Sequence, residues 1–382
     1  MGSTSELIIL LLQFFGIAYL VLIALYTLGW FRMKTFRTGE KDPAQFLSVL
    51  IAARNEEENI SECLTSLLAQ NYPAGLYEII VVDDRSEDGT AALVEKIIRE
   101  HPDHSLHLLR LRPGESAGKK AAIARAVEKS KGPLLISTDA DCVMGPQWLR
   151  NIASCYEKHH PMMIPGPVAF HGEKSWFARL QSLEFLSLVA SGAGSVGIHS
   201  PIMCNGANLA FEKQAYLKVK GLSHDEQFMS GDDVFLMLKI RKQFGKDAVQ
   251  FLKSREALVY TTPSKSFAAF LRQRLRWVSK SKGYTNLGII TASLLIYLFN
   301  YMIFASFLLS IWIPGLILVS LLALVFKSLV DLPILLGITS FAKKQSLMWF
   351  FLPLQILYVP YIAIVGLLGN LVRVNWKGRY GR

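Results

Sequence analysis

The apolar residues of this chain gather in two long stretches that flank a more polar middle region. Residues 7–30 contain no charged side chain and are long enough to cross a bilayer core of roughly 30 Å as a helix. Residues 287–372 are similarly apolar, and their only charged side chains are Lys327, Asp331, Lys343 and Lys344. The pattern predicts an N-terminal membrane anchor and a C-terminal membrane region with three or four passes.

Within the middle region, apolar runs of strand length alternate with amphipathic stretches of helix length. We expect strands at 46–53, 77–82, 106–111 and 134–137, and helices at 57–69, 90–99 and 120–129. The repeated strand–helix order predicts an α/β fold with a mostly parallel, Rossmann-like sheet and helices on both faces. In such sheets, ligands bind beyond the carboxyl ends of the strands.

A further amphipathic helix is expected after the middle region. At 100° per residue, one arc of this helix is apolar and the opposite arc collects Gln273, Arg276, Trp277 and Lys280. The apolar arc consists of Phe267, Leu271, Leu275 and Val278. We expect the apolar arc to lie in the membrane interface or against the domain, and the polar arc to face a ligand crevice. The alternative is an interfacial helix with snorkelling arginines and a belt tryptophan.

These patterns divide the chain into five expected parts. They are an anchor at 1–31, a polar domain at 32–263, the amphipathic interfacial helix at 264–286, the C-terminal membrane region at 287–372 and a basic tail at 373–382. Basic residues directly after the first apolar stretch, among them Arg32 and Lys34, favour the cytoplasmic side. The polar domain is therefore expected in the cytosol, and the chain in the inner, cytoplasmic membrane if it is bacterial.

The number of C-terminal passes stays open. Lys343 and Lys344 favour the cytoplasmic side, and so do the basic residues of the tail, but one unbroken span over 347–371 would separate the two groups. A re-entrant or proline-broken hairpin near Pro353 and Pro360 would remove this conflict.

The composition supports a membrane protein. The chain has 382 residues, of which 51% are hydrophobic, and this share is high for a soluble enzyme. The net charge is +11, but the cations lie beside the membrane segments and on one amphipathic stretch rather than on a nucleic-acid-reading motif. Membrane lipids and phosphates are therefore the expected partners, and nucleic acid is not. The four cysteines form no CxxC pair, which indicates free thiols in a reducing compartment.

Two acidic residues one position apart, Asp139 and Asp141, follow the fourth expected strand. In an extended segment, residues i and i+2 point the same way, so both carboxylates face one small volume. Close carboxylates repel each other unless a cation lies between them, and their oxygens suit Mg2+ or Mn2+. The sequence therefore favours a divalent metal site at Asp141 and Asp139, with a solvated turn as the alternative.

Two further polar clusters follow the first and second expected strands. They comprise Ala53, Arg54, Asn55 and Glu56 after the first strand, and Asp83 and Asp84 after the second. One crevice at the carboxyl ends of the strands would collect both clusters together with Asp139. The expected sheet carries neither GxGxxG nor GxxxxGK[ST], so neither a dinucleotide fold nor a P-loop is indicated. The alternative for Asp83 and Asp84 is that they cap the following helix.

Several of these motifs, in this order, resemble the family 2 glycosyltransferases of the GT-A fold, in their membrane-bound branch. The segments that carry the resemblance are Val81-Val-Asp-Asp-Arg-Ser-Glu-Asp-Gly-Thr90, Gly118-Lys-Lys-Ala-Ala122, Asp139-Ala-Asp141, Gly231-Asp-Asp233 and Gln273-Arg-Leu-Arg-Trp277. The last matches a QxxRW motif found in poly-N-acetylglucosamine, hyaluronan, cellulose and ceramide glucosyl synthases. The loop 205–211 also resembles an acceptor-side loop of the family, in which glycine permits close backbone approach.

The resemblance implies a role for each matching residue. It assigns Asp83 and Asp84 to the donor base and ribose, Lys119 and Asp139 to the donor diphosphate, and the strand-one cluster to donor binding. Asp141 with Asp139 would hold Mg2+ or Mn2+. Asp233 would be the general base next to Asp232, and Gln273, Arg276 and Trp277 would serve the leaving group and the acceptor. From the residues alone, Lys119 is equally a solvated lysine, and Asp232 and Asp233 are equally helix caps.

The implied activity is that of an inverting, metal-dependent hexosyltransferase. Its partners would be a nucleotide-sugar donor, expected to carry UDP, and a lipid or lipid-linked acceptor. One alternative is a processive polysaccharide synthase of the poly-N-acetylglucosamine or hyaluronan type. A second alternative is a membrane-tethered protein that binds a nucleotide sugar without catalysing transfer.

Overall fold

The computed structural model describes residues 2–39, 42–112, 114–220, 232–279, 283–369, 375–376 and 379–380. For residues 2–4, 232 and the last two segments, only the backbone is described. The chain forms two compact units. Unit 1 comprises Met1–Arg32, Glu173–Ile202 and Pro263–Arg382, and unit 2 comprises Met33–Gly172 and Met203–Thr262. Residues 173–202 were expected in the polar domain, but they group with the apolar helices of unit 1.

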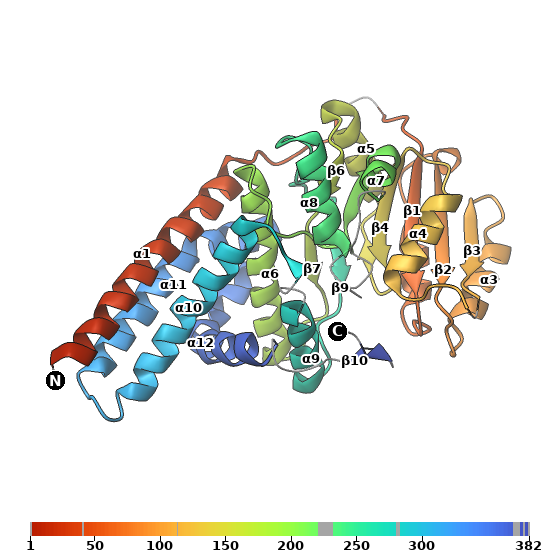
Figure 1. Cartoon of the computed structure of the whole chain (residues 1–382). Helices are drawn as coiled ribbons and strands as arrows, with labels where there is room; N and C mark the ends of the chain where they lie inside the picture. The colour runs from red at the N-terminus through yellow and green to blue at the C-terminus, as the bar shows by residue number, and fades with distance from the viewer. Residues whose placement is uncertain are drawn as a thin grey trace. The chain divides into compact units, whose positions relative to one another are not determined.

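Unit 2 is built on a six-stranded sheet (Figure 1). In spatial order its strands are β3 (Leu106–Arg110), β2 (Tyr77–Asp83), β1 (Leu47–Ala53), β4 (Leu134–Asp139), β8 (Leu209–Glu212) and β6 (Met163–Pro165). Strands β1 to β4 are parallel, and β8 runs antiparallel to both of its neighbours. All seven residues of β2 are buried, as expected for a parallel strand covered on both faces.

Helices and a small second sheet complete unit 2. The helices are α2 (Ile60–Leu68), α3 (Thr90–Glu100), α4 (Lys119–Lys129), α5 (Trp148–His159), α7 (Lys213–Lys220), α8 (Asp232–Phe244) and the short η1 (Ala74–Leu76). The second sheet is formed by β5 (Val143–Met144), β9 (Val259–Thr261) and β7 (Val168–Phe170). In α2, Ile60, Cys63, Leu64 and Leu67 are buried at helical spacing. The predicted α/β fold is confirmed, with one antiparallel strand in the main sheet.

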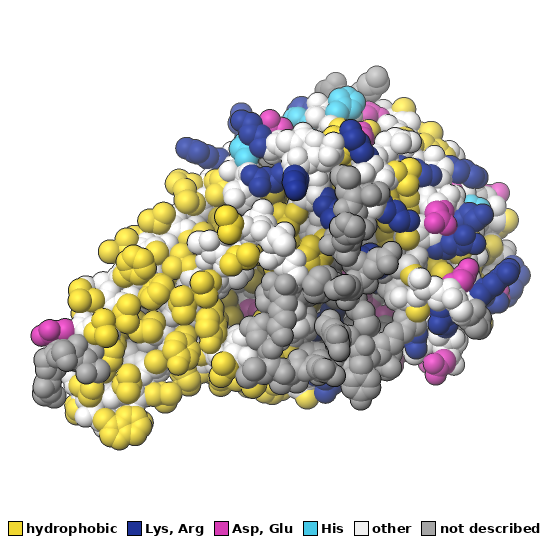
Figure 2. All heavy atoms as spheres, in the orientation of Figure 1, with side chains coloured by type: hydrophobic (Ala, Val, Ile, Leu, Met, Phe, Trp, Pro, Cys, Tyr) yellow, Lys and Arg dark blue, Asp and Glu magenta, His cyan; other side chains and the backbone are white. Residues whose placement is uncertain are grey.

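Unit 1 is helical, apart from a two-stranded ladder of β10 (Asn375–Trp376) and β11 (Arg379–Tyr380). Its helices are α1 (Gly2–Arg32), α6 (Trp176–Gly197), α9 (Phe267–Ser279), α10 (Leu287–Leu309), α11 (Leu316–Phe341), η4 (Gln345–Phe350) and α12 (Phe351–Leu368). Four helical segments are long and apolar enough to cross a membrane: Ser5–Arg32, Leu287–Leu309, Leu316–Phe341 and Gln345–Leu368. Figure 2 shows apolar side chains over these helices, as expected for surfaces that face lipid.

Glycines let α1 and α6 approach each other at backbone distance. A Cβ atom at Gly29 would meet the backbone of Gly194, and one at Gly197 would meet the backbone of Gly29. Glycine inside a helix destabilises it by about 1 kcal/mol relative to alanine. Here the glycines allow the two helices to pack at backbone distance, which a larger side chain would prevent.

A cluster of four polar side chains connects three of the apolar helices. This membrane-helix cluster consists of Tyr19 from α1, Lys327 and Asp331 from α11, and Gln355 from α12. Lys327 Nζ donates to Asp331 Oδ2 at 2.8 Å and to Gln355 Oε1 at 2.6 Å. Tyr19 OH donates to Asp331 Oδ1 at 2.6 Å, and Gln355 Nε2 donates to Asp331 Oδ2 at 3.1 Å. Because an unpaired charge is costly in an apolar bundle, this network favours one register of the three helices.

We predict that Lys327→Met lowers the unfolding temperature of the protein and that the double variant Lys327→Met/Asp331→Asn recovers much of this loss of stability. The single substitution leaves the Asp331 charge without its cation, which costs about 2 kcal/mol, whereas the double substitution removes both charges. Thermal unfolding of the purified protein in detergent measures the difference, with Lys343→Met as an exposed-lysine control. Equal unfolding temperatures for the single and double variants would contradict the prediction.

Candidate functional site

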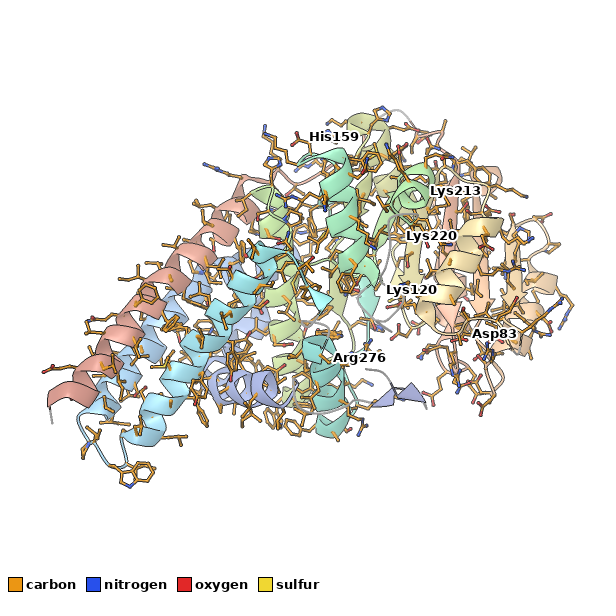
Figure 3. The ribbon with its side chains drawn as sticks, in the orientation of Figure 1. Asp83, Lys120, His159, Lys213, Lys220 and Arg276 are labelled. Atoms are coloured by element: carbon orange, nitrogen blue, oxygen red, sulfur yellow. The ribbon has the colours of Figure 1, made fainter. Side chains whose placement is uncertain are left out.

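The carboxyl ends of β1, β2 and β4 meet at one edge of the main sheet. In the parallel ladders, Ala52 of β1 lies opposite Asp139 of β4, and Ala53 lies opposite Asp83 of β2. Figure 3 labels Asp83 at the end of its strand. The register of three neighbouring strands therefore brings the three polar clusters of the sequence to one edge.

Asp83 and Asp84 are buried where β2 ends. The Ser86 amide donates to Asp83 Oδ1 at 3.3 Å, and the Gly118 amide donates to Asp84 Oδ2 at 2.9 Å. The following helix α3 has Gly89 as its N-cap residue, and its first amide, that of Thr90, donates to Asp88 Oδ1 at 3.0 Å. The carboxylates of Asp83 and Asp84 thus accept from amides outside α3. They organise the loop and the start of the segment that leads to α4.

The cluster after β1 is held in a fixed turn. Asn55 has a φ of 53°, in the left-handed region that asparagine tolerates better than most residues. Its amide donates to Ser86 Oγ at 3.0 Å, and its side-chain oxygen accepts from the Glu87 amide at 2.9 Å. Arg54 donates to the Asp84 carbonyl oxygen at 3.4 Å. These bonds join the loops after β1 and β2 into one polar wall.

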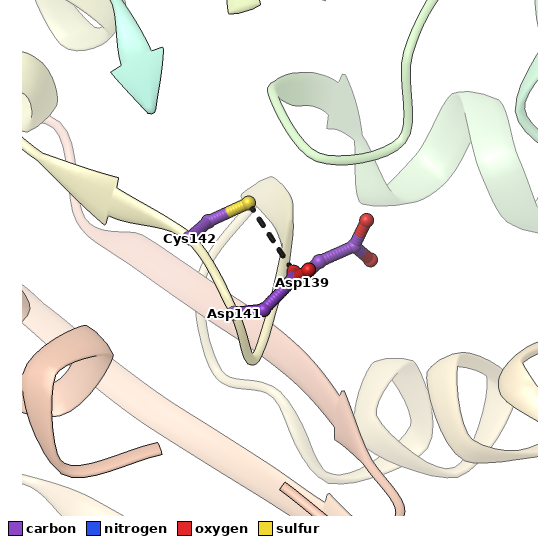
Figure 4. A group of neighbouring side chains, drawn as sticks. All are labelled: Asp139, Asp141 and Cys142. Carbon is purple, nitrogen blue, oxygen red and sulfur yellow. Dashed lines mark hydrogen bonds between the residues drawn. The ribbon is translucent and has the colours of Figure 1, made fainter. Parts of the chain in front are cut away.

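Asp139 and Asp141 form the acidic part of the site (Figure 4). Together with Cys142 they offer possible ligand atoms that all lie within 4.8 Å of one another. Burial, and then the charges of Asp139 and Glu56, raise the pKa of Asp141 to about 6. Burial also raises the pKa of the Cys142 thiol, and its soft sulfur suits Mg2+ or Mn2+ less well than carboxylate oxygen does. The two carboxylates are thus the residues that fit a divalent cation, because a cation relieves their repulsion.

A hydrogen bond from the second sheet orients Asp141. Thr261 Oγ1, at the end of β9, donates to Asp141 Oδ2 at 3.2 Å. The other carboxylate oxygen of Asp141 accepts from the Cys142 thiol at 3.7 Å.

Three charged side chains lie close together near the backbone of Gly206. Lys119 and Asp233 lie beside Gly206, and Asp139 pairs with Lys119. Lys119, the first residue of α4, forms an ion pair with Asp139. The Gly206 amide donates to Asp233 Oδ2 at 3.1 Å, and the Val234 amide donates to Asp233 Oδ1 at 2.9 Å. A Cβ atom at position 206 would lie 3.3 Å from Lys119 Nζ and 3.6 Å from Asp233 Oδ2, so a side chain would crowd this place. The site therefore combines an acid pair, a cation and a further carboxylate.

The loop that carries Gly206 is anchored on both sides. Thr138 Oγ1 of β4 donates to the Ala207 carbonyl oxygen at 2.8 Å. The buried Asn208 side chain donates to the Pro167 and Ala257 carbonyl oxygens at 2.8 Å each and accepts from Trp148 Nε1 at 3.0 Å. A rigid loop of this kind holds a backbone amide at a defined place, as a preorganised site requires.

The remaining candidates belong to unit 1 or lie outside the described residues. Gln273, Arg276 and Trp277 are in α9 of unit 1, and Figure 3 labels Arg276 there. The side chain of Asp232 lies outside the described residues, as do Gly231 and the side chains of the tail 373–382.

The buried face of α9 differs from the expected apolar arc. Phe267 of that arc is 64% exposed, whereas Arg274 is only 3% exposed. The sequence analysis missed Arg274 because arginine is usually exposed, although helical spacing places position 274 next to Phe267 on the apolar arc. It also missed Thr261, whose contact with Asp141 joins residues far apart in the chain.

The comparisons with known proteins agree with the geometry of unit 2. A family model described as glycosyltransferase like family 2 matches residues 43–280, more than half of the chain. The chain is similar in fold to the mannosyltransferase PcManGT from Pyrobaculum calidifontis, solved with GDP-Man and Mn2+, with a TM-score of 0.59 and 18% identity. That similarity covers 95% of this chain and 99% of the other.

Two curated relatives match shorter segments. Glycosyltransferase AglE of Haloferax volcanii is 36% identical over 125 residues, 33% of this chain and 40% of that protein. Beta-monoglucosyldiacylglycerol synthase of Trichormus variabilis is 28% identical over 133 residues, 34% of this chain and 28% of that protein. The chain thus spans less than half the length of these two relatives.

We predict that Asp141→Ala lowers the affinity of the protein for Mn2+ at least tenfold and that Thr261→Val lowers it less. The first change removes a carboxylate ligand, and the second removes only the hydrogen bond that orients it. Isothermal titration with MnCl2 measures both, with Asp103→Ala in an exposed turn as the control. Unchanged Mn2+ affinity in Asp141→Ala would argue against a metal site here.

Proposed function

Because this chain belongs to glycosyltransferase family 2, we propose that it transfers a hexose from a nucleotide-diphosphate sugar to a lipid or lipid-linked acceptor, with inversion at the anomeric carbon. The observation that carries the proposal is the gathering of Lys119, Asp139 and Asp233 around Gly206, beside Asp141. A diphosphate donor needs positive charge, and an acceptor hydroxyl needs a base, and this group of residues offers both.

The donor would bind at the edge where β1, β2 and β4 end. We assign the nucleoside to the wall made by Ala53, Arg54, Asn55 and Glu56 together with Asp83 and Asp84. The diphosphate would lie against Lys119, whose ammonium group offsets the charge that develops on the leaving group. A divalent ion bound by Asp139 and Asp141, Mg2+ or Mn2+, would neutralise the same diphosphate.

Asp233 is assigned as the general base. Its carboxylate is fixed by the amides of Gly206 and Val234, and an oriented carboxylate is suited to accept the proton of an acceptor hydroxyl. The hydroxyl oxygen would form the new bond to the anomeric carbon from the face opposite the diphosphate, which leaves with its electron pair. One displacement inverts the configuration, in contrast to the two-step route of retaining glycosidases. We keep the roles that the family resemblance implies for the other candidates. Asp232 lies next to the base in the sequence, and Gln273, Arg276 and Trp277 would serve the leaving group and the acceptor.

The lipid nature of the acceptor is supported by unit 1 and by one relative. The described residues of unit 1 provide four helices of membrane length, which is little material for a polymer channel within one chain. A beta-monoglucosyldiacylglycerol synthase is among the similar proteins. A processive polysaccharide synthase is the second candidate, since QxxRW also occurs in such enzymes.

The contacts of α12 favour three membrane crossings rather than four. Gln355, early in α12, binds Lys327 and Asp331, of which Asp331 lies about ten residues or about 15 Å from the end of α11 at Phe341. Gly366, late in α12, contacts the ring of Tyr297, which lies about ten residues or about 15 Å from the start of α10.

Both ends of α12 therefore contact the α10–α11 pair at the same depth. Helices α10 and α11 are antiparallel neighbours, because Ser320 Oγ donates to Ser306 Oγ at 2.7 Å near the connection between them. Figure 1 shows α12 lying across the direction of these two helices. We propose that α1, α10 and α11 cross the membrane and that α12 lies in its cytoplasmic half. Arg32, Lys343, Lys344 and the tail then share the cytoplasmic side, which satisfies the positive-inside rule.

We predict that Asp233→Asn strongly slows sugar transfer and preserves donor binding. Asparagine keeps an oxygen for the Gly206 amide but is not a base, so turnover should fall by about 10²- to 10⁴-fold. Radiolabelled UDP- and GDP-sugars are incubated with membranes and Mn2+, followed by lipid extraction, with Asp103→Asn as the control.

The distribution of the label decides between the candidates. Label in the organic phase supports lipid glycosylation, and label in high polymer supports a processive synthase. Donor binding without any transfer would favour a non-catalytic protein. Full turnover in Asp233→Asn would remove this residue as the base.

The topology is tested by single cysteines at Trp312, Lys343 and Lys377. We expect an impermeant maleimide to label position 312 from one side of sealed vesicles, and positions 343 and 377 from the other, compared with the parent chain. If positions 312 and 377 are labelled from the same side, α12 crosses the membrane.

A further inference from the structure

A buried ion pair lies next to the QxxRW residues of α9. Arg274 and Glu184 of α6 have side chains that are 3% and 5% exposed. Arg274 Nε donates to Glu184 Oε1 at 3.0 Å, and a second guanidinium nitrogen donates to Glu184 Oε2. This bidentate pair of hydrogen bonds fixes both the position and the plane of the guanidinium group.

The stability of unit 1 alone does not account for this pair. Removing two charges from water is costly, and apolar side chains of similar volume often replace such a pair without loss of stability. A buried pair is therefore better explained by what its fixed geometry does for its neighbours. Two of those neighbours are the first and last residues of the motif.

Arg274 sets the orientation of Gln273. Its third guanidinium nitrogen donates to Gln273 Oε1 at 2.6 Å. Arginine has donors and no acceptor, so the amide atom that faces it is the oxygen. The amide nitrogen of Gln273 is thereby presented as a donor, which suits a hydroxyl or phosphate oxygen of a substrate.

Arg274 also covers one face of Trp277. The guanidinium carbon lies 4.1 Å from the Trp277 ring centroid and 4.6 Å from that of Phe270, within cation–π distance of both rings. Phe185 of α6 lies 6.4 Å from Trp277 at an interplanar angle of 38°. One face of the indole is therefore occupied by the protein's own cation, and the plane of the ring is fixed.

We propose that Arg274, held by Glu184, is a positioning residue for acceptor recognition. It presents the Gln273 amide nitrogen and the opposite face of Trp277 to the acceptor, which would bring a hydroxyl group and an apolar or sugar-ring surface. The proposal rests on the proposed transferase function. It assigns to Arg274 no contact with the donor, whose nucleoside and metal-binding residues are assigned to unit 2.

The test distinguishes two roles for Arg274: orienting Gln273 and Trp277, or only neutralising the buried charge of Glu184. Arg274→Met leaves Glu184 buried without a partner, whereas the double variant Arg274→Met/Glu184→Met removes both charges. Arg272→Met is the matched control, because Arg272 lies on the same helix and is exposed. For each variant we measure the unfolding temperature in detergent, UDP affinity with Mn2+, KM for the acceptor, and the near-UV circular dichroism that Trp277→Phe removes.

We expect the double variant to recover the unfolding temperature but not the acceptor KM. Arg274→Met should unfold at a lower temperature than the parent and raise the acceptor KM at least tenfold. The double variant should unfold near the parent temperature, keep the raised KM and lack the Trp277 dichroism, with UDP affinity within twofold of the parent. Arg272→Met should match the parent in all four measurements.

The proposal is overturned if the double variant recovers the acceptor KM and the Trp277 dichroism together with stability. It is also overturned if Arg274→Met leaves both unchanged. If the parent transfers no sugar from any donor, the proposed function fails instead. The dichroism of the same variants then still decides whether Arg274 orients Trp277.

Discussion

Repulsion between neighbouring carboxylates is the constraint that organises the candidate site. Asp139 and Asp141 are held together at the end of β4, and burial, followed by the neighbouring Asp139 charge, raises the pKa of Asp141. Positive charge relieves the repulsion, and Lys119 already supplies part of it through its ion pair with Asp139. A site that attracts cations in this way is suited to a substrate that carries phosphates, because metal and diphosphate bind as partners.

Placing these charges requires contacts that join distant parts of the chain. Parallel strands deliver Asp83 and Asp139 to one edge, but Asp141 is oriented only when β9 brings Thr261 beside it. Asp233 likewise depends on the loop of Gly206, which Thr138 and Asn208 hold in place. The main sheet thus sets the location, and later segments of the chain set the orientation of each side chain.

Local patterns were sufficient to predict the first four strands, the helices between them and the polar residues at the strand ends. Apolar runs predicted β1 to β4 within a few residues, and burial on both faces of β1, β2 and β4 explains the clear signal in those strands. The same patterns did not predict Thr261 or Arg274, whose neighbours come from β4 and α6. Helical periodicity also grouped Phe267 and Leu275 on one apolar arc, of which Leu275 is buried and Phe267 is exposed, since packing against other elements decides which residues are covered. The grouping of residues 173–202 with the apolar helices is non-local in the same way.

Helix α12 contacts both of the buried ion pairs described above, Lys327–Asp331 and Glu184–Arg274. Gln355 of α12 bonds to the Lys327–Asp331 pair, and Tyr361 of the same helix lies 5.6 Å from the ring of Phe270, which stacks on Arg274. Each pair is satisfied in one arrangement of its neighbours, because a displaced donor or acceptor in an apolar setting loses its partner at high cost. A helix tied to two such pairs has little freedom to slide or rotate. The proposed cytoplasmic-half position of α12 and the orientation of the α9 motif are therefore coupled: a shift of α12 along its axis would disturb Lys327 and Arg274 together.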